Sequence, residues 1–118
     1  MNIKVKNVCG VAGLDACNMQ ATTPAEIASW VADAQAHNTW LVIVLHEVGE
    51  FSRATAIANG TICDADITEA GVDPDACVQD PSYAITPANL DASLNLIKQS
   101  GVAVVTVQQA IAELKPQL

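Results

Sequence analysis

Apolar and polar residues alternate at the start of the chain, over residues 1–8. Ile3 and Val5 recur at every second position and are separated by Lys4 and Lys6, which is the period of a half-buried strand. We therefore predict a short strand at an edge of a sheet, with its lysine-bearing side in water.

A helix is predicted to begin at Thr23, because Thr23 is a suitable N-cap, Pro24 can occupy the first helical position and Glu26 can close a capping box. Asn38 is suited to end this helix. The apolar residues in between recur at helical spacing, so one face should pack inward. That face carries Ile27, Trp30, Val31 and Ala34.

The segment Trp40 to Leu45 is an unbroken apolar run. A strand of a parallel sheet that is covered on both faces has this pattern, whereas a strand with one solvated face alternates. We predict that this segment is the central strand of the sheet.

Two further helices and one strand are predicted in the C-terminal third of the chain. One helix begins at Thr86 and Pro87 and ends at Gly101, a residue suited to the left-handed conformation that terminates helices. A short buried strand then covers residues 102–106, and a last helix covers residues 107–114. The inward residues of these two helices are expected to be Leu90, Leu94 and Ile97, and Ala110, Ile111 and Leu114.

Residues 47–85 form a connection far longer than the usual ~4–6 residues. The predicted order is therefore β-α-β-(loop)-α-β-α, an α/β fold in one domain of residues 1–118 with about three parallel strands, three helices and one long loop. A short helix over residues 51–58 is an alternative for part of the loop. The loop has one base, Arg53, and eight acids: Glu47, Glu50, Asp64, Asp66, Glu69, Asp73, Asp75 and Asp80.

The composition excludes several classes of partner. The chain has 118 residues with 13 acidic and 5 basic side chains, and a formal net charge of −8. Such a chain lacks the basic surface that binds nucleic acid, and the same sign of charge disfavours anionic membranes. Its longest apolar run is also far shorter than the ~20 residues of a membrane-spanning helix. We expect neither nucleic acid nor membrane as a partner.

The four cysteines fall in two loop-like places, Cys9 with Cys17 and Cys63 with Cys77. Neither pair has the two-residue spacing of a zinc knuckle. We predict two disulfides, each local in the sequence. Free thiols and a metal site remain alternatives, because cysteine positions alone do not establish oxidation.

His46 is the first candidate for chemistry. It directly follows the most apolar predicted strand, and catalytic groups of parallel α/β sheets gather at the carboxyl ends of the strands. Its imidazole could act as a general acid or base tuned by Glu47 or Glu50. Alternatively, this histidine only hydrogen-bonds the loop backbone.

Three segments together resemble the C-terminal part of a NodB-like polysaccharide deacetylase: residues 40–47, residues 83–87 and residues 101–110. The resemblance extends to residues 23–27. Members of that family are distorted (β/α) barrels that use zinc or another divalent metal to remove acetyl groups from carbohydrate polymers. The resemblance implies a partial (β/α) barrel, with His46 as the general acid and Val44 lining the acetyl-methyl pocket. Glu47 stands where the family usually has an aspartate at the substrate.

The sequence also departs from this family. Its aspartate pair, its two metal-binding histidines and its arginine-containing motif have no counterpart among residues 1–118. The other histidine, His37, is expected at a helix C-terminus, where it interacts with the helix dipole. Without a base and a metal, hydrolysis has no activator. The resemblance therefore implies a truncated deacetylase-like unit that is not active alone and binds no cofactor.

Three hypotheses for function follow. The first is this inactive deacetylase-derived unit, whose His46 is a remnant or one half of a site completed by another chain. The second is a binding or assembly module without catalysis, and the third is a hydrolase rebuilt around His46, Glu47 and the loop acids. In a partial barrel the inner sheet face is uncovered, so we expect a homodimer that buries it, or the long loop folded across it. Carbohydrate is a further possible partner.

The compartment stays open. Residues 1–8 lack the basic start and apolar stretch of a secretory signal, whereas the family that the chain resembles is commonly exported.

Overall fold

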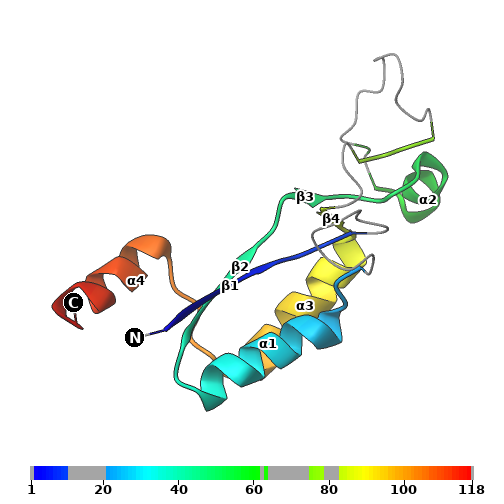
Figure 1. The fold of residues 1–118 in the computed structure, drawn as a ribbon. Coiled ribbons are helices and arrows are strands. Elements are labelled where there is room, and N and C mark those ends of the chain that lie inside the picture. Colours follow the sequence, from blue (N-terminus) through cyan, green and yellow to red (C-terminus); the bar gives the residue numbers. More distant parts are fainter. Residues whose placement is uncertain (1, 11–20, 62, 64–74, 79–82, 118) are drawn as a thin grey trace.

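The computed structural model describes residues 2–10, 21–61, 63, 75–78 and 83–117. The described chain is a mixed α/β protein and is elongated, with principal extents of 51 × 27 × 27 Å. The elements follow in the order β1 (Ile3–Asn7), α1 (Pro24–Ala36), β2 (Trp40–Val44), β3 (Glu47–Val48), α2 (Arg53–Asn59), β4 (Ala84–Ile85), α3 (Pro87–Gln99), α4 (Val107–Leu114) and the 3-10 helix η1 (Lys115–Gln117) (Figure 1).

The strands form two separate parallel pairs. β1 pairs with β2, from Ile3 opposite Trp40 to Asn7 opposite Val44. β3 pairs with β4, with Glu47 opposite Ala84. The prediction of parallel strands joined by helices is confirmed, but the described residues form four strands in two small sheets and four α-helices, and these strands do not close a barrel.

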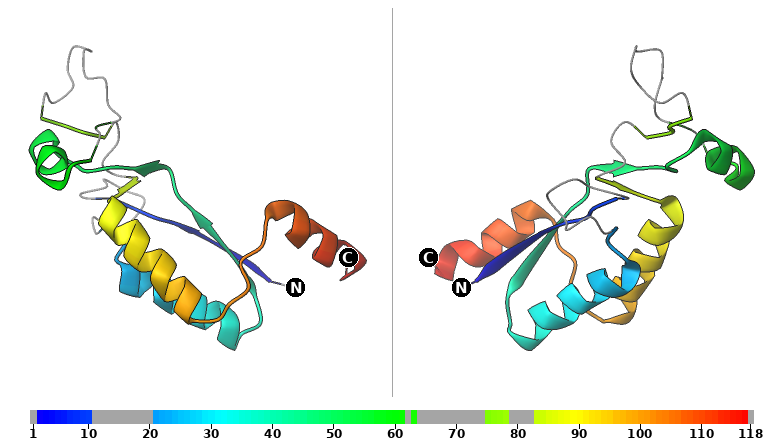
Figure 2. Two further views of the ribbon diagram at one scale, coloured as in Figure 1. Left: turned by 180° about the vertical axis from the view of Figure 1, so that it is seen from behind. Right: turned by 45° about the vertical axis from the view of Figure 1, so that its right-hand side comes forward.

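The predicted strand at residues 102–106 is wrong. This segment lies in no strand, and the side chain of Val104 is 78% exposed. An apolar, β-branched run favours an extended chain, but a strand also needs a neighbouring edge that pairs with its backbone groups. The segment instead leads to α4, which lies at the opposite end of the molecule from α2 (Figures 1 and 2).

The helix boundaries agree closely with the sequence signals. The hydroxyl of Thr23 accepts a hydrogen bond from the backbone N–H of Glu26 at 3.1 Å, and that of Thr86 accepts one from Asn89 at 3.2 Å. The chain reverses after α1 and α3 at Asn38 and Gly101, whose φ angles are +49° and +72°. These helices start and stop where local side chains and glycine satisfy the free backbone groups.

The core lies between the β1–β2 sheet and the helices α1 and α3, which run side by side (Figure 2). Gln35 of α1 donates a hydrogen bond from Nε2 to the carbonyl of Ser100 at 3.2 Å, which ties the C-terminal ends of the helices together. The buried centre is Val8, Ile27 and Ile85, and the half-buried residues around it are Trp30, Ile43, Leu90 and Ile97.

The two faces of the β1–β2 sheet differ from the prediction. Lys4 and Lys6 point toward α1, where Lys4 pairs with Asp33 and the ammonium of Lys6 lies 5.5 Å from the ring centroid of Trp30. The opposite side of β1 is the open one: Ile3 and Val5 are 51% and 60% exposed. The lysine-bearing side is therefore in contact with solvent, since Lys6 is exposed, but it also faces α1. The long lysine stems reach the helix, where their charges find a carboxylate and an aromatic ring.

The second strand, β2, is exposed on the same side of the sheet as Ile3 and Val5. Val42, opposite Val5 in the register, is 45% exposed, so the prediction that this strand is covered on both faces is wrong. Residues opposite each other in parallel strands point to the same side of the sheet. We call this side the open face; it consists of Ile3, Val5 and Asn7 of β1 and of Trp40, Val42 and Val44 of β2.

The inward faces predicted for the last helices are only partly correct. Leu90 and Ile97 pack against the core, but Leu94 is exposed. Ile111 of α4 is exposed as well, because the only element that packs substantially against α4 among the described residues is η1.

The segment predicted as a long loop, residues 47–85, contains β3, α2 and β4. The hydroxyl of Ser52 caps α2 by accepting a hydrogen bond from the N–H of Thr55, and Gly60 ends it at φ +66°. An antiparallel bridge joins Ser52 to Ala76. The acids Asp64, Asp66, Glu69, Asp73 and Asp80 lie outside the described residues.

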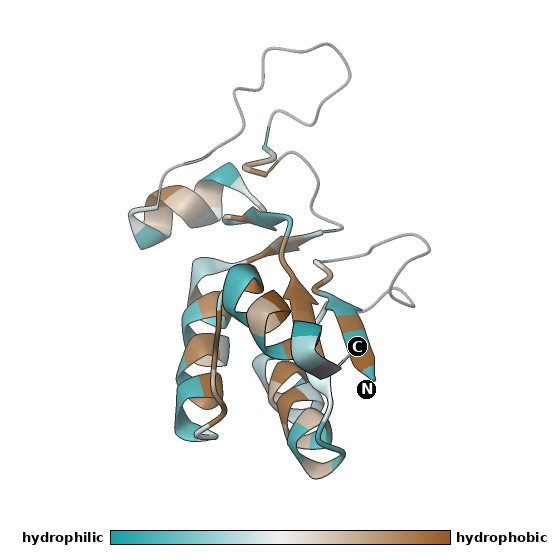
Figure 3. Cartoon of the chain, turned by 90° about the vertical axis from the view of Figure 1, so that its left-hand side faces the viewer, coloured by the Kyte–Doolittle hydropathy of each residue, from teal (hydrophilic) through white to brown (hydrophobic). Residues whose placement is uncertain are grey.

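The distribution of apolar and polar residues fits the packing of the helices and strands. Apolar residues alternate with polar ones along α1 and α3, and β2 is almost wholly apolar (Figure 3). Among the described residues, no helix has the length and apolar character that crossing a bilayer requires.

Candidate functional site

His46 lies two residues beyond β2 and directly before β3, at the carboxyl end of the β1–β2 pair. Its ring lies beside that of Tyr83, with 4.9 Å between the ring centroids and 49° between the ring planes. The parallel pairing of β3 with β4 explains this contact. Because Glu47 is opposite Ala84, the residues just before them, His46 and Tyr83, are brought together.

The pairing of these two rings was missed by sequence reasoning. Residues 46 and 83 are 37 positions apart, and in the sequence Tyr83 stands out only as part of the family resemblance. The contact could have been predicted only from the two-residue strand Ala84–Ile85. This strand directly follows Tyr83, just as β3 directly follows His46. Pairs of such short strands are difficult to recognise from a sequence, because a period of two cannot be established over two residues.

The surroundings of the two rings differ. His46 is exposed, whereas Tyr83 is half-buried. An exposed imidazole can exchange protons with a bound molecule as well as with water. The contact with Tyr83 restricts the orientations of the imidazole without covering it.

Val44 and Glu47 flank this pair. Val44 is the last residue of β2, half-buried and on the open face, and its carbonyl accepts a hydrogen bond from the N–H of Val8 at 3.0 Å. Glu47 begins β3 and is also half-buried. The structure therefore holds both residues at the same sheet edge as His46.

Glu50, which the sequence suggested as a group that tunes His46, has another partner. It is only 6% exposed, and its Oε1 accepts a hydrogen bond from Nδ2 of Asn59 at 3.0 Å. A buried carboxylate needs such a donor. This bond fixes the end of α2 to the chain that follows β3.

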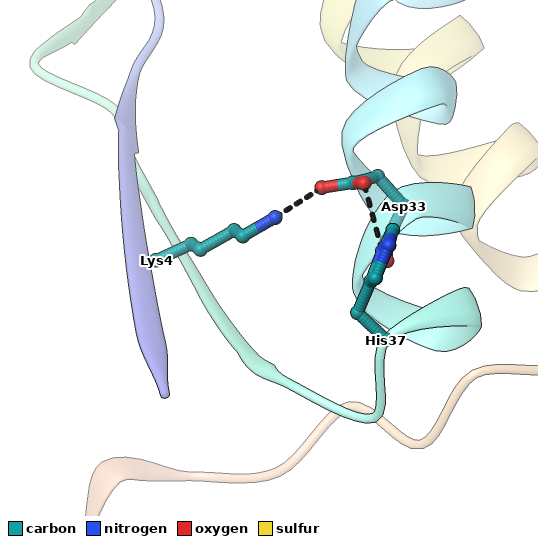
Figure 4. Close-up of polar contacts among 3 residues, drawn as sticks. All are labelled: Lys4, Asp33 and His37. Carbon is teal, nitrogen blue, oxygen red and sulfur yellow. Dashed lines mark hydrogen bonds and ion pairs between the residues drawn. The ribbon is translucent and has the colours of Figure 1, made fainter. Parts of the chain in front are cut away.

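His37 contacts Asp33 at the end of α1. Its Nδ1 lies 3.0 Å from Oδ1 of Asp33, and the other oxygen of this carboxylate binds Lys4 (Figure 4). The hydrogen bond from Lys4, with the nearby positive charges, lowers the pKa of Asp33 below its usual value of 3.8. As the sequence predicted, His37 lies at the end of α1. It precedes β2, whereas His46 follows that strand.

The disulfide between Cys63 and Cys77 is present, as predicted. Cys9 is also disulfide-bonded, whereas Cys17, its predicted partner, lies outside the described residues. None of the described cysteines is a free thiol. The alternatives of thiols or of a metal site at Cys9, Cys63 and Cys77 therefore do not apply.

The residues described here do not fit the divalent metal that the family resemblance implies. Nowhere among them do three histidine, cysteine, aspartate or glutamate side chains come together in a group that could hold an ion. A catalytic zinc site needs three protein ligands. We therefore derive no chemical step through a metal.

Comparison with family models, with curated proteins and with solved structures finds no match for this chain. What the site offers chemically is an exposed imidazole beside a phenol ring, at the edge of a parallel sheet, with an apolar residue and a carboxylate next to it.

Proposed function

We propose that this chain is a deacetylase-like α/β unit without hydrolytic activity of its own, in which His46 holds the position of a general acid. The observation that carries this proposal is the contact of His46 with Tyr83 at the carboxyl end of the β1–β2 pair. It places an imidazole where parallel α/β sheets gather their catalytic groups. A partial (β/α) barrel remains part of this proposal.

Each neighbouring residue has a role in this proposal. A protonated His46 would donate its proton to the amine or alkoxide that leaves during deacetylation. Val44 would contact the acetyl methyl group, and Glu47 would lie at the substrate. The base that activates water is not supplied by these residues, and His46 alone cannot replace it.

An acetyl-release assay tests the proposal. The whole chain is incubated with an acetylated chitooligosaccharide and zinc, and liberated acetate is measured. We expect no acetate above the rate without protein. Turnover that disappears in His46→Ala and persists in His37→Ala would contradict the proposal, because it would require a complete hydrolytic site around His46.

A binding measurement tests the role of His46 more directly. Titration with the same oligosaccharide should shift the ring-proton signals of His46 in NMR spectra, while those of His37 serve as the internal control. A shift confined to His46 supports a site that still recognises carbohydrate. No shift at either ring would remove carbohydrate from the proposal.

The open face favours a second candidate function, an assembly module on the same scaffold. Ile3, Val5 and Val42 present an apolar surface that a lone catalytic unit does not need, and such surfaces mark interaction sites. Under this alternative, or for half of a split deacetylase, the chain acts only in a complex. Absence of carbohydrate binding combined with stable association would support it.

A further inference from the structure

Asn59 and Gly60 form the one asparagine–glycine pair of the sequence. Glycine has no Cβ, so the backbone nitrogen of Gly60 is unhindered. Such a nitrogen can attack the side-chain amide carbon of the preceding asparagine, which is the first step of deamidation. The other asparagines are each followed by a residue with a side chain; they are Asn2, Asn7, Asn18, Asn38, Asn89 and Asn95. The sequence therefore makes Asn59 the asparagine most susceptible to this reaction.

The fold holds these two residues in an arrangement that opposes the reaction. Asn59 is the last residue of α2, and Gly60 is its C-cap. In a helix the Cα–Cβ bond tilts toward the N-terminus, whereas the nitrogen of Gly60 lies on the C-terminal side of Asn59. That nitrogen also donates a hydrogen bond to the carbonyl of Ile57 at 3.2 Å. In folded α2 the two reacting groups are therefore wrongly oriented for attack.

A buried carboxylate holds the amide of Asn59 as well. Nδ2 of Asn59 donates a hydrogen bond to Oε1 of Glu50 at 3.0 Å, and Glu50 is only 6% exposed. Hydrogen bonds to carboxylates are stronger than those between neutral groups. Breaking this one would leave a buried acceptor without a donor, which is unfavourable. The bond thus keeps the amide turned toward Glu50, nine positions earlier in the chain, rather than toward Gly60.

The helix that provides this protection is short and little buried. α2 has 7 residues, of which only Ala56 is buried, and it stands apart from α1 and α3 (Figures 1 and 2). A helix of this length is unstable in water by itself, so its hydrogen bonds should open more readily than those of packed helices. Each opening releases the amide of Asn59 and the N–H of Gly60 together.

We propose that Asn59 is a deamidation site that folded α2 protects and that each opening of this helix exposes. The nitrogen of Gly60 gives up its proton and bonds to Cγ of Asn59, while the Cγ–Nδ2 bond breaks and the side-chain nitrogen leaves with that proton as ammonia. Water then adds to one of the two carbonyl carbons of the succinimide ring and breaks the bond from that carbon to the ring nitrogen. Addition at Cγ gives aspartate, and addition at the backbone carbonyl gives isoaspartate. Water is the only co-reactant.

The product of this reaction prevents α2 from forming again as before. An ionised carboxylate has only acceptor atoms, so an aspartate at position 59 would face Glu50 with no donor between the two groups. Isoaspartate would also lengthen the backbone at the end of the helix. The opening of α2 is thus reversible before deamidation and permanent after it. This inference goes beyond the proposed function and does not depend on any role of His46.

The first test compares the deamidation of the folded and the unfolded chain. The whole chain is incubated at neutral pH, in buffer and in guanidinium chloride, and the products at each asparagine are measured by chromatography and mass spectrometry of proteolytic peptides. Asn95 is the internal control, because it also donates to a carboxylate, that of Asp91 at 3.3 Å, but precedes Leu96. In denaturant Asn59 should react much faster than Asn95. In buffer Asn59 should react at least about 100-fold more slowly than in denaturant.

Variants of the chain test the hydrogen bond from Asn59 to Glu50. Glu50→Ala removes the acceptor and should speed deamidation of Asn59 in the folded chain about 10-fold, without changing the rate in denaturant. Glu26→Ala is the matched control, since it removes an exposed carboxylate on α1, and it should leave the rate unchanged. Should Glu50→Ala fail to fold, Ser52→Ala serves in its place. It removes the cap of α2 and should speed the reaction about 5-fold.

Asn59→Asp tests the consequence for α2, because this variant has the deamidated side chain from the start. The amide of Ala56 in α2 should exchange with deuterium about 10-fold faster than in the wild-type chain. Asn95→Asp makes the same change beside Asp91, which is exposed. There the amide of Ser100, which bonds the carbonyl of Leu96, should change its exchange rate by less than about 3-fold.

Four outcomes would overturn the inference. The first two are a rate at Asn59 that is no higher in denaturant than in buffer, and equal rates at Asn59 and Asn95 in denaturant. The third is a folded Glu50→Ala chain, or Ser52→Ala in its place, that deamidates at the wild-type rate. The fourth is an unchanged exchange rate of the Ala56 amide in Asn59→Asp.

Discussion

Lys4 on β1 and Asp33 on α1 form an ion pair that joins the edge of the sheet to the first helix (Figure 4). Lys4 thus points from β1 toward α1. Because side chains alternate along a strand, Ile3 and Val5 must then lie on the other side, where they are exposed. The open face is therefore the side of the sheet that points away from Lys4, Lys6 and the core residue Ile43.

The same ion pair should give the stability of the chain a dependence on acid pH. The pKa of Asp33 is lowered, first by its hydrogen bond with Lys4, below the usual 3.8. A group with a lowered pKa in the folded state stabilises fully above its unfolded pKa. Its contribution is then lost as the pH falls from 3.8 through the lower folded value. Chemical denaturation between pH 2 and pH 6 measures this loss.

Lys4→Met should move the pKa of Asp33 up toward 3.8, as followed by NMR titration of the side chain. Lys98→Met, on α3, removes the same charge elsewhere and is the control. Equal shifts in both variants would mean that net charge, rather than the ion pair, sets the pKa.

The contact between His46 and Tyr83 should be sensitive to loss of the ring at position 83. Tyr83→Leu should remove the ring-current shift of the His46 protons and lower the free energy of unfolding by less than about 1 kcal/mol, since aromatic pairs contribute about 0.5–1.5 kcal/mol and His46 is exposed. NMR spectra and urea denaturation measure both effects. Tyr83→Phe keeps the ring and should retain the shift; the same change in both variants would contradict the contact.

The disulfide between Cys63 and Cys77 should stabilise α2 locally. The two cysteines are 14 positions apart in the sequence, and closing a loop of this size constrains the unfolded chain by about 3 kcal/mol. In the double variant Cys63→Ala/Cys77→Ala, the amide of Ala56, which bonds the carbonyl of Ser52, should exchange with deuterium about 100-fold faster. The amide of Ile27 in α1 should keep its rate. Equal acceleration at both amides would show that the disulfide acts on the whole fold.

Gly49 should not tolerate a larger side chain. A Cβ at this position would lie 2.7 Å from Cγ1 of Val78, so Gly49→Ala should destabilise the chain by about 1–3 kcal/mol in thermal or urea unfolding. Adding Val78→Ala removes the clashing atom and should recover part of this loss in a double-mutant cycle.

Gly60→Ala provides the comparison for this cycle. Nothing lies within 4 Å of a Cβ there, but φ is +66°, so its cost of about 1–2 kcal/mol comes from the backbone alone. Val78→Ala should recover none of it. Recovery at Gly60, or none at Gly49, would contradict the steric explanation.

Much of the secondary structure was predictable from short sequence signals. Thr23 and Thr86 each accept a hydrogen bond from the residue three positions later, and Gly101 ends the region of α3. Each of these signals involves residues that are only a few positions apart, so both partners can be recognised in one short stretch of the sequence. The position of His46 after an apolar strand was predictable for the same reason.

The sequence could not decide how these elements meet. The sequence determined the alternation of apolar and polar residues in β1 and the apolar character of residues 40–45 and 102–106. It also determined the four local signals at which helices begin and end. The tertiary structure decided that the lysines of β1 face α1, that residues 102–106 find no strand edge among the described residues, and that Tyr83 lies beside His46. The physical reason is distance along the chain. A cap depends on neighbours in the sequence, whereas the burial of a face, the pairing of a strand and the contact of two rings depend on groups that only folding brings together.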